Sequence, residues 1–182
     1  MNNRVKMVLI LTLFACVSGG ILSLIYMFAN PLIEANMLEE QRSSIFIVVP
    51  GAESYEEKSA DGITYFECKD SSGGIAGIAL PAQGNGYQGV IKLMVGLTPD
   101  LERITGVKVL EQVETPGLGG RIGEEAFQNQ FNDISVEPEV EYVKNQKPEK
   151  DNQIRAVTGA TISSRSVVAI INRAVSEFSE VM

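Results

Sequence analysis

The chain has 182 residues, and its 23 Asp and Glu against 15 Lys and Arg give a net charge of −8 at pH 7. Because nucleic acids are negatively charged, we expect no nucleic-acid partner for a chain this acidic. Because histidine is absent, Ser-His-Asp and Cys-His nucleophilic sites and His-ligated zinc are excluded. Its two cysteines, Cys16 and Cys68, form no Cys-x-x-Cys motif and so carry no zinc or iron–sulfur signature. No metal site is expected.

The first predicted element is an uncharged apolar stretch at residues 7–29. As a helix rising about 1.5 Å per residue it would span about 34 Å, enough for the hydrocarbon core of a bilayer. A cleaved signal peptide is the alternative, and Cys16 follows a sequence that loosely resembles a lipoprotein cleavage box. The apolar run continues well past Cys16 and exceeds the usual signal core of about 7–15 residues. We therefore expect a retained transmembrane helix after a short N-terminus, residues 1–6.

Flanking charge predicts the orientation of this helix. Arg4 and Lys6 precede it, whereas three glutamates follow it before the first basic residue, Arg42. The positive-inside rule then places the N-terminus in the cytoplasm and the rest of the chain on the extracytoplasmic side of a cell membrane. Beyond residue 30 the chain has 13 basic and 23 acidic residues, a net charge of −10.

Residues 30–50 are predicted to continue helically as a stalk, with apolar residues at near-helical spacing, until Pro50 and Gly51 end the segment. Residues 51–182 then form one domain of ordinary size. Pro31 lies at the junction between the apolar stretch and the stalk, and proline is tolerated in the first turn of a helix.

Alternating and β-rich runs follow within this domain. Residues 62–68 and 75–80 flank a turn and predict one hairpin, and residues 89–97 and 103–112 predict a second. Residues 122–131 have the pattern of a short helix.

The last third of the domain has a charged segment and a clear helix. Residues 140–150 predict an edge strand followed by an exposed loop. Residues 163–180 carry one apolar stripe at helical spacing, and Ser163 or Ser164 can cap the start of this helix. The pattern predicts an α+β fold, an antiparallel sheet flanked by helices.

Residues 84–89 match the G-x-G-x-x-G pattern of dinucleotide-binding folds. That site requires a helix after the glycines, whereas a β-rich run follows here. We interpret this segment as a loop entering a strand.

Two further segments each have two interpretations. Residues 114–120, rich in Pro and Gly, form either a tight turn or a loop whose backbone closely approaches a flat ligand, and chemistry alone favours the turn. Residues 158–164 form either a hydroxyl-rich helix cap or a phosphate site. In the second case, Thr161 lies just ahead of a helix N-terminus, and the small residues Gly159 and Ala160 leave its hydroxyl accessible.

These segments together resemble a known family. Residues 158–164, TGATISS, resemble the [S/T]-G-A-T-x-[S/T]-[S/T] attachment motif of covalent FMN-binding domains, and residues 114–119, ETPGLG, resemble the loop that accompanies it. Residues 86–89 resemble a third block. With the N-terminal helix, the likeness covers essentially the whole chain. It is strongest to the G subunits of Rnf ion-translocating ferredoxin:NAD⁺ oxidoreductases, while the similar C subunits of sodium-pumping NADH:quinone oxidoreductases are usually longer.

The resemblance implies that a flavin transferase uses FAD to attach FMN to Thr161 and that residues 114–119 line the isoalloxazine. It assigns no catalytic residue. The cofactor-binding residues that it implies are Thr158, Gly159, Ala160, Thr161, Ser163, Ser164, Glu114, Thr115, Gly117 and Leu118. The chain departs from the family pattern at Gln112, where His is common, and at Arg155 or Ala156, where Asp is frequent. An arginine here could pair with the FMN phosphate.

The resemblance implies a subunit that relays electrons within a membrane redox complex. The flavin would supply the redox chemistry, and the assembled complex would couple the electron flow to Na⁺ or H⁺ movement. Its partners would be the other subunits of the complex. Two alternatives remain from other classes: a membrane-anchored FMN domain acting as a regulator or sensor, and a cofactor-free interaction domain in which residues 158–164 serve only as a helix cap.

Overall fold

The computed structural model describes residues 3–182, and the chain divides into two compact units, Met1–Glu40 and Gln41–Met182. Helix α1 (Asn3–Val48) supplies the described part of the first unit. By length and composition it is the one helix among the described residues that could cross a membrane. The predicted span 7–29 and most of the predicted stalk lie within this one helix. Pro31 lies inside it rather than in a first turn.

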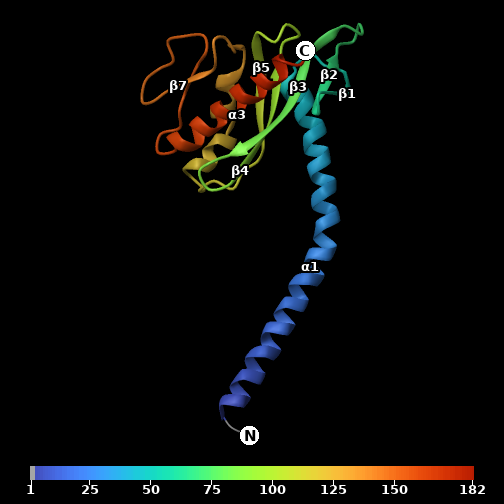
Figure 1. Ribbon diagram of the computed structural model, residues 1–182, viewed down its shortest axis with the longest axis vertical. Helices are drawn as coiled ribbons and strands as arrows, with labels where there is room; N and C mark the ends of the chain where they lie inside the picture. The colour runs from blue at the N-terminus through green and yellow to red at the C-terminus, as the bar shows by residue number, and fades with distance from the viewer. Residues whose placement is uncertain (1–2) are drawn as a thin grey trace. The chain divides into compact units, whose positions relative to one another are not determined.

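The second unit is built on a six-stranded sheet in which every neighbouring pair is antiparallel and the strand order follows the sequence. This confirms the predicted α+β fold with an antiparallel sheet (Figure 1). The six strands are β1 (Ser54–Ala60), β2 (Ile63–Lys69), β3 (Ile75–Asn85), β4 (Val90–Leu97), β5 (Arg103–Glu111) and β6 (Ile134–Ser135).

Short helices and a second sheet complete this unit. A parallel pair forms the second sheet. The remaining elements are η1 (Gly119–Gly123), α2 (Glu125–Gln128), η2 (Asn129–Phe131), β7 (Glu141–Val143), β8 (Gln153–Arg155) and α3 (Thr161–Ser179).

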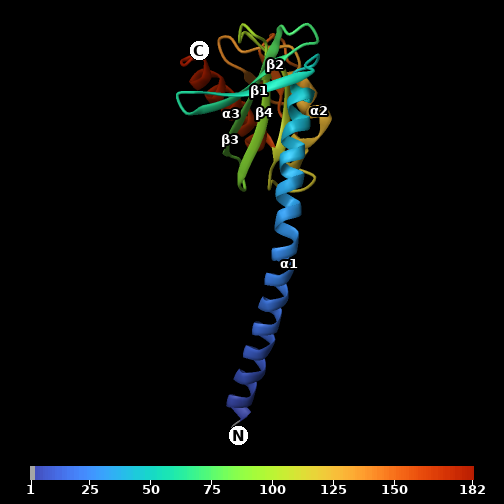
Figure 2. The same ribbon diagram turned by 90° about the vertical axis from the view of Figure 1, so that its right-hand side faces the viewer.

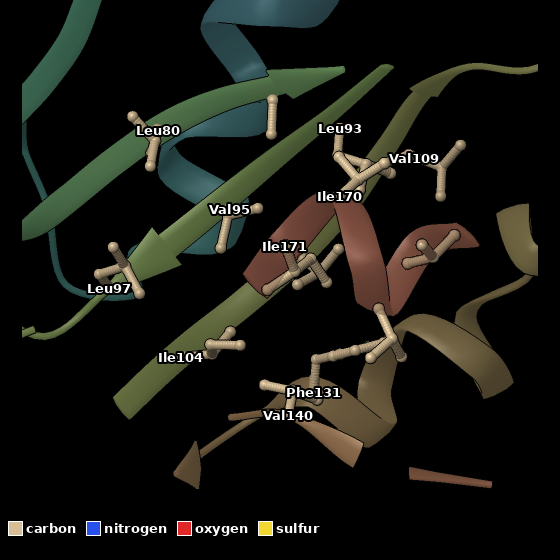
Figure 3. Close-up of a cluster of buried hydrophobic side chains, with 14 of the residues drawn as sticks. Leu80, Leu93, Val95, Leu97, Ile104, Val109, Phe131, Val140, Ile170 and Ile171 are labelled. Carbon is tan, nitrogen blue, oxygen red and sulfur yellow. The ribbon is translucent and has the colours of Figure 1, made fainter. Parts of the chain in front are cut away.

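The main core lies between α3 and one face of the six-stranded sheet (Figures 1 and 3). Leu93 and Val95 of β4 point to this face and meet Ile170 and Ile171 of α3, all nearly inaccessible to solvent. Successive residues of a strand alternate between faces, so Met94 belongs to a separate cluster on the other side. This packing fixes α3, and therefore its first turn, against the sheet.

The opposite face of the sheet receives the end of α1, residues 41–48 (Figure 2). The backbone of Val48 lies directly on strands β4 and β5, where Thr105 donates its hydroxyl to the Val48 carbonyl at 2.5 Å. A Cβ atom at Gly96 would overlap that carbonyl and lie 2.5 Å from the Thr105 hydroxyl oxygen. The close approach therefore requires glycine at position 96.

Several predicted elements differ from the structure. Residues 141–143 form a strand, as expected, but it pairs in parallel with β8, which the sequence pattern did not reveal. Strands β1 and β6 were also missed. Helix α3 begins at Thr161, two residues before the predicted start, and neither Ser163 nor Ser164 is its N-cap. The cap residue is Ala160, whose methyl side chain makes no hydrogen bond.

We predict that Gly96→Ala destabilises the second unit by about 1–3 kcal/mol, because the new methyl group must displace either the end of α1 or Thr105. Urea unfolding of the full chain in detergent, followed by circular dichroism, measures the loss. Gly123→Ala is the matched control, since a Cβ atom there meets nothing within 4 Å. Equal stability of the two variants would contradict the proposed close packing.

Candidate functional site

Three segments that are far apart in the sequence meet at one end of the sheet. Strand β4 begins at Val90 and its antiparallel neighbour β5 ends at Glu111, so the turn before β4 and the segment after β5 lie at the same end. The first turn of α3 packs against this segment, because a Cβ atom at Gly119 would lie 2.7 Å from the hydroxyl oxygen of Ser163. All three segments belong to the family motifs.

The turn at residues 86–89 is held by the carboxylate of Glu114. Gly86 donates its amide to the carbonyl of Gly89 at 2.7 Å, which closes the turn. The amides of Tyr87 and Gln88 donate to Oε1 of Glu114 at 2.7 and 3.0 Å. The segment thus forms a loop entering β4, as predicted, and binds a carboxylate of its own chain.

The second carboxylate oxygen of Glu114 binds the first turn of α3. Ser163 donates its hydroxyl to Oε2 at 2.6 Å, and the two side chains are 3% and 4% exposed. Among residues 3–182, no Lys or Arg forms an ion pair with Glu114. This buried carboxylate is therefore stabilised by hydrogen-bond donors alone, and it connects all three segments.

The donors also set the acidity of Glu114. Loss of solvent on burial raises its pKa, but the Ser163 hydroxyl and the amides of Gln88, Tyr87 and Gly89 together outweigh this effect. The pKa of Glu114 therefore lies below its usual value, and the group is ionised at neutral pH.

The segment after Glu114 is a tight turn, as chemistry alone favoured. Leu118 donates its amide to the carbonyl of Thr115 at 3.1 Å, with Pro116 and Gly117 between them. Gly117 has φ +74°, which is the dihedral that a turn of this type requires at its third position. Gln112 supports the start of the segment, since its Oε1 accepts the amide of Glu114 at 2.6 Å.

A second turn of the same kind precedes α3. Ala160 donates its amide to the carbonyl of Val157 at 2.9 Å, and Gly159 at the third position has φ +84°. A Cβ atom at Gly159 would lie 3.3 Å from the side chain of Leu118, so the two turns lie beside each other. Thr158, which is exposed, lines a cavity of about 120 Å³ together with Arg121 and Arg155.

Thr161 is the first residue of the 19-residue helix α3 and is partly exposed. The first turn contains no acidic residue. Ser164 does not face outward: its hydroxyl donates to the carbonyl of Ala160 at 3.1 Å and accepts the amide of Val157 at 3.0 Å. No acceptor for the amides of residues 161–163 is found in the described chain. Free amides and the helix dipole favour a phosphate group here.

The structure thus separates the predicted site residues by exposure. Thr158, Gly159, Gly117 and Leu118 are exposed, and Thr161 and Thr115 are partly exposed. Glu114, Ala160, Ser163 and Ser164 are buried. The Glu114 carboxylate and the hydroxyls of Ser163 and Ser164 form hydrogen bonds within the chain. Sequence reasoning missed the roles of Gln112 and of the Tyr87 and Gln88 amides. Only the third resembling block, residues 86–89, pointed to the latter.

Exposed apolar side chains surround these turns. Leu118 is 49% exposed and touches the position of Gly159, while Val113 lies against Gly89. Tyr87 and Ile162 are 64% and 45% exposed. The region around Thr161 therefore offers apolar surface suited to a flat aromatic ligand.

Comparison with known proteins agrees with this geometry. The FMN-binding domain family model matches residues 86–176, which include all three turns and the first turn of α3. The G subunit of the ion-translocating oxidoreductase complex of Methanosarcina acetivorans is 32% identical over 178 residues, which cover 93% of this chain and 92% of that one.

The chain belongs to this family of FMN-binding G subunits. The membership confirms the resemblance and the prediction of FMN as the cofactor. A second relative is the G subunit of the proton-translocating ferredoxin:NAD(+) oxidoreductase complex of Clostridium ljungdahlii, 28% identical over 92% of this chain and 87% of that one.

The fold is also that of solved structures. The crystal structure of Shewanella oneidensis NqrC matches with a TM-score of 0.58 at 23% identity, covering 70% of this chain and 66% of that chain. At this identity the match supports the fold.

We predict that Glu114→Gln changes the pH dependence of stability. Because the pKa of Glu114 is lowered in the folded state, its ionised form stabilises the fold above the unfolded-state pKa of about 4.3, and this contribution is lost as pH falls through the folded-state pKa. The stability advantage of the original chain over Glu114→Gln should therefore be larger at pH 7 than at pH 3.

Urea unfolding of the full chain in detergent at both pH values measures this difference. Other carboxylates with lowered pKa values, such as those of Asp100 and Asp151, titrate in both proteins and cancel. A stability difference independent of pH would show that the Glu114 carboxylate has no special stabilisation.

Proposed function

We propose that the chain is the electron-carrying flavoprotein subunit of a membrane-bound, ion-translocating oxidoreductase complex, with FMN attached to Thr161. The near-complete coverage of relatives that are G subunits supports this assignment. The same coverage favours a G subunit over the C subunit of a sodium-pumping NADH:quinone reductase. The other subunits of the complex are its partners, and this chain has no independent active site.

The position of Thr161 is the observation that supports covalent attachment of FMN to this residue. Its hydroxyl is on a partly exposed side chain at the first residue of a long helix, beside free amides and without a nearby carboxylate on the same turn. A phosphodiester there carries one negative charge, which the helix N-terminus stabilises by about 0.3–1 kcal/mol. The residues present therefore fit an FMN phosphoester.

Attachment requires a flavin transferase and FAD. The Thr161 hydroxyl oxygen attacks the phosphorus of the FMN half of FAD, the pyrophosphate P–O bond breaks, AMP leaves, and the hydroxyl proton passes to a base of the transferase. A non-covalent cofactor stays bound only where its free concentration is comparable to the dissociation constant. A covalent link removes that requirement on the extracytoplasmic side of a membrane.

The protein positions the cofactor, and FMN supplies the one- and two-electron redox chemistry when bound. The turn at residues 115–118 and its neighbours Tyr87 and Val113 would hold the flat ring by apolar contact. Arg155 lines the same cavity as Thr158 and would provide positive charge on that side of the turn before α3. No side chain of this chain needs to act as an acid or base.

Helix α1 anchors the chain in the cell membrane. The basic residues Arg4 and Lys6 lie in its first turn, and the helix carries its glutamates only after residue 30. The N-terminus therefore lies in the cytoplasm and the FMN-binding domain on the extracytoplasmic side.

Replacing Thr161 tests the attachment. We predict that Thr161→Val, made with a flavin transferase present, gives a folded protein without covalent flavin, because the nucleophilic oxygen is lost. The measurement is flavin fluorescence of the denatured protein band. Thr64→Val is the matched control, because Thr64 is an exposed threonine on strand β2, outside the three turns, and this variant keeps the fluorescence. Covalent flavin on Thr161→Val, or its loss from both variants alike, would contradict the assignment.

Limited proteolysis tests the orientation. Lys144 and Lys150 are exposed in the loop between β7 and β8, and neither is followed by proline, so trypsin should cleave there. Trypsin added to spheroplasts should cut the domain, and inside-out vesicles should protect it until detergent is added. The reverse protection pattern would place the domain in the cytoplasm.

A further inference from the structure

The start of α3 lacks the feature that usually fixes a helix N-terminus. An N-cap side chain normally accepts an amide of the second or third helical residue, and Ala at this position stabilises the helix start less than Ser or Asp does. Here the N-cap is Ala160, with no side-chain hydrogen bond. The hydroxyl of Ser164, which could have capped a later start, binds the carbonyl of Ala160 instead.

The first turn is nevertheless tied down from outside the helix. Ser163 at the third helical position donates to Glu114, and Glu114 is fixed in turn by the amides of Tyr87 and Gln88. This tie uses a side chain of the first turn and leaves the amides of residues 161–163 without acceptors in the part of the chain that the structure describes. A conventional cap would have occupied one of these amides.

We propose that Glu114 and Ser163 are positioning residues for FMN attachment: their buried hydrogen bond replaces the helix cap and orients Thr161 while keeping the helix amides open to the FMN phosphate. This inference rests on the proposed attachment at Thr161. It also gives a physical reason for the two motifs to occur together, since one residue of each forms the bond.

Orientation matters because the Thr161 oxygen must meet the phosphorus in line with the leaving group. Thr161 is two residues from Ser163 in the same turn, so a loosened Ser163 lets the first turn fray and move the hydroxyl. Thr161 is partly exposed and does not bond Glu114 itself, so Glu114 acts on it only through Ser163.

Four substitutions separate the hydrogen bond from charge and packing. Ser163→Ala and Glu114→Ala each remove one partner of the bond. Ser163→Thr keeps the hydroxyl. Glu114→Gln keeps the shape and can accept the Tyr87 and Gln88 amides through its oxygen while its amide donates to the Ser163 oxygen, without the charge.

The experiment measures FMN transfer from FAD to the full-length chain in detergent by a purified flavin transferase, as a function of the chain's concentration. Ser163→Ala and Glu114→Ala should lower kcat about tenfold, with KM changed less than about twofold because the exposed surface is retained. Ser163→Thr and Glu114→Gln should stay within about threefold of the original chain.

Ser166→Ala is the matched control, because Ser166 lies on the same helix and has no side-chain hydrogen bond within residues 3–182. Its transfer rate should equal that of the original chain. The double variant Glu114→Ala, Ser163→Ala should be no slower than about twice the slower single variant, because both changes break one bond. If Glu114→Ala does not fold, the comparison of Ser163→Ala with Ser163→Thr decides.

An unchanged kcat in Ser163→Ala, or an equal loss in Ser163→Thr, would overturn the positioning role while FMN is still found on Thr161. FMN transfer to Thr161→Val at the original rate is a different outcome. It would contradict the assignment of Thr161 as the attachment residue, and this inference with it. The two failures are therefore distinguishable in one assay.

Discussion

The buried carboxylate of Glu114 is the constraint on which the site depends. An ionised group at 4% exposure without a cation is unfavourable unless donors surround it, and here two backbone amides and one hydroxyl do so. Each donor comes from a different part of the chain than Glu114 itself. The group therefore holds the turn before β4, the turn after β5 and the start of α3 in one arrangement.

The rest of the second unit supports this arrangement. The antiparallel β4–β5 pair brings two of the segments to the same end of the sheet, and the core between the sheet and α3 fixes the third. Glycines permit the close contacts: a Cβ atom at Gly119 would lie 2.6 Å from the Glu114 carboxylate. Packing and turn chemistry, rather than a deep cavity, thus create a place where Thr161 remains accessible.

The sequence predicted the elements whose pattern is local. The strands at residues 62–68 and 103–112 are rich in β-branched or aromatic residues, and the apolar stripe of the last helix is long, so each was found within a few residues. Strand β1 was missed because its residues are mostly polar and exposed, and β6 because it has only two residues. The parallel β7–β8 pair is a contact between segments that no local pattern encodes.

At the site, the family resemblance proposed a set of residues, but the sequence could not assign their contacts. Ser163 and Ser164 have the composition of a helix cap, yet the helix begins before them, because tertiary bonds to Glu114 and Ala160 use their hydroxyls. A local rule is broken at Ala160, and such violations are expected where function requires free backbone groups. The membership in the FMN-binding family fixes the cofactor, and the geometry of α3 points to Thr161 as its attachment residue. Tandem mass spectrometry of the tryptic peptide 156–165, from full-length chain made with a flavin transferase, tests this directly. We expect an FMN phosphoester on Thr161, and an unmodified peptide, or FMN on Thr158 or Ser163, would contradict the proposed attachment.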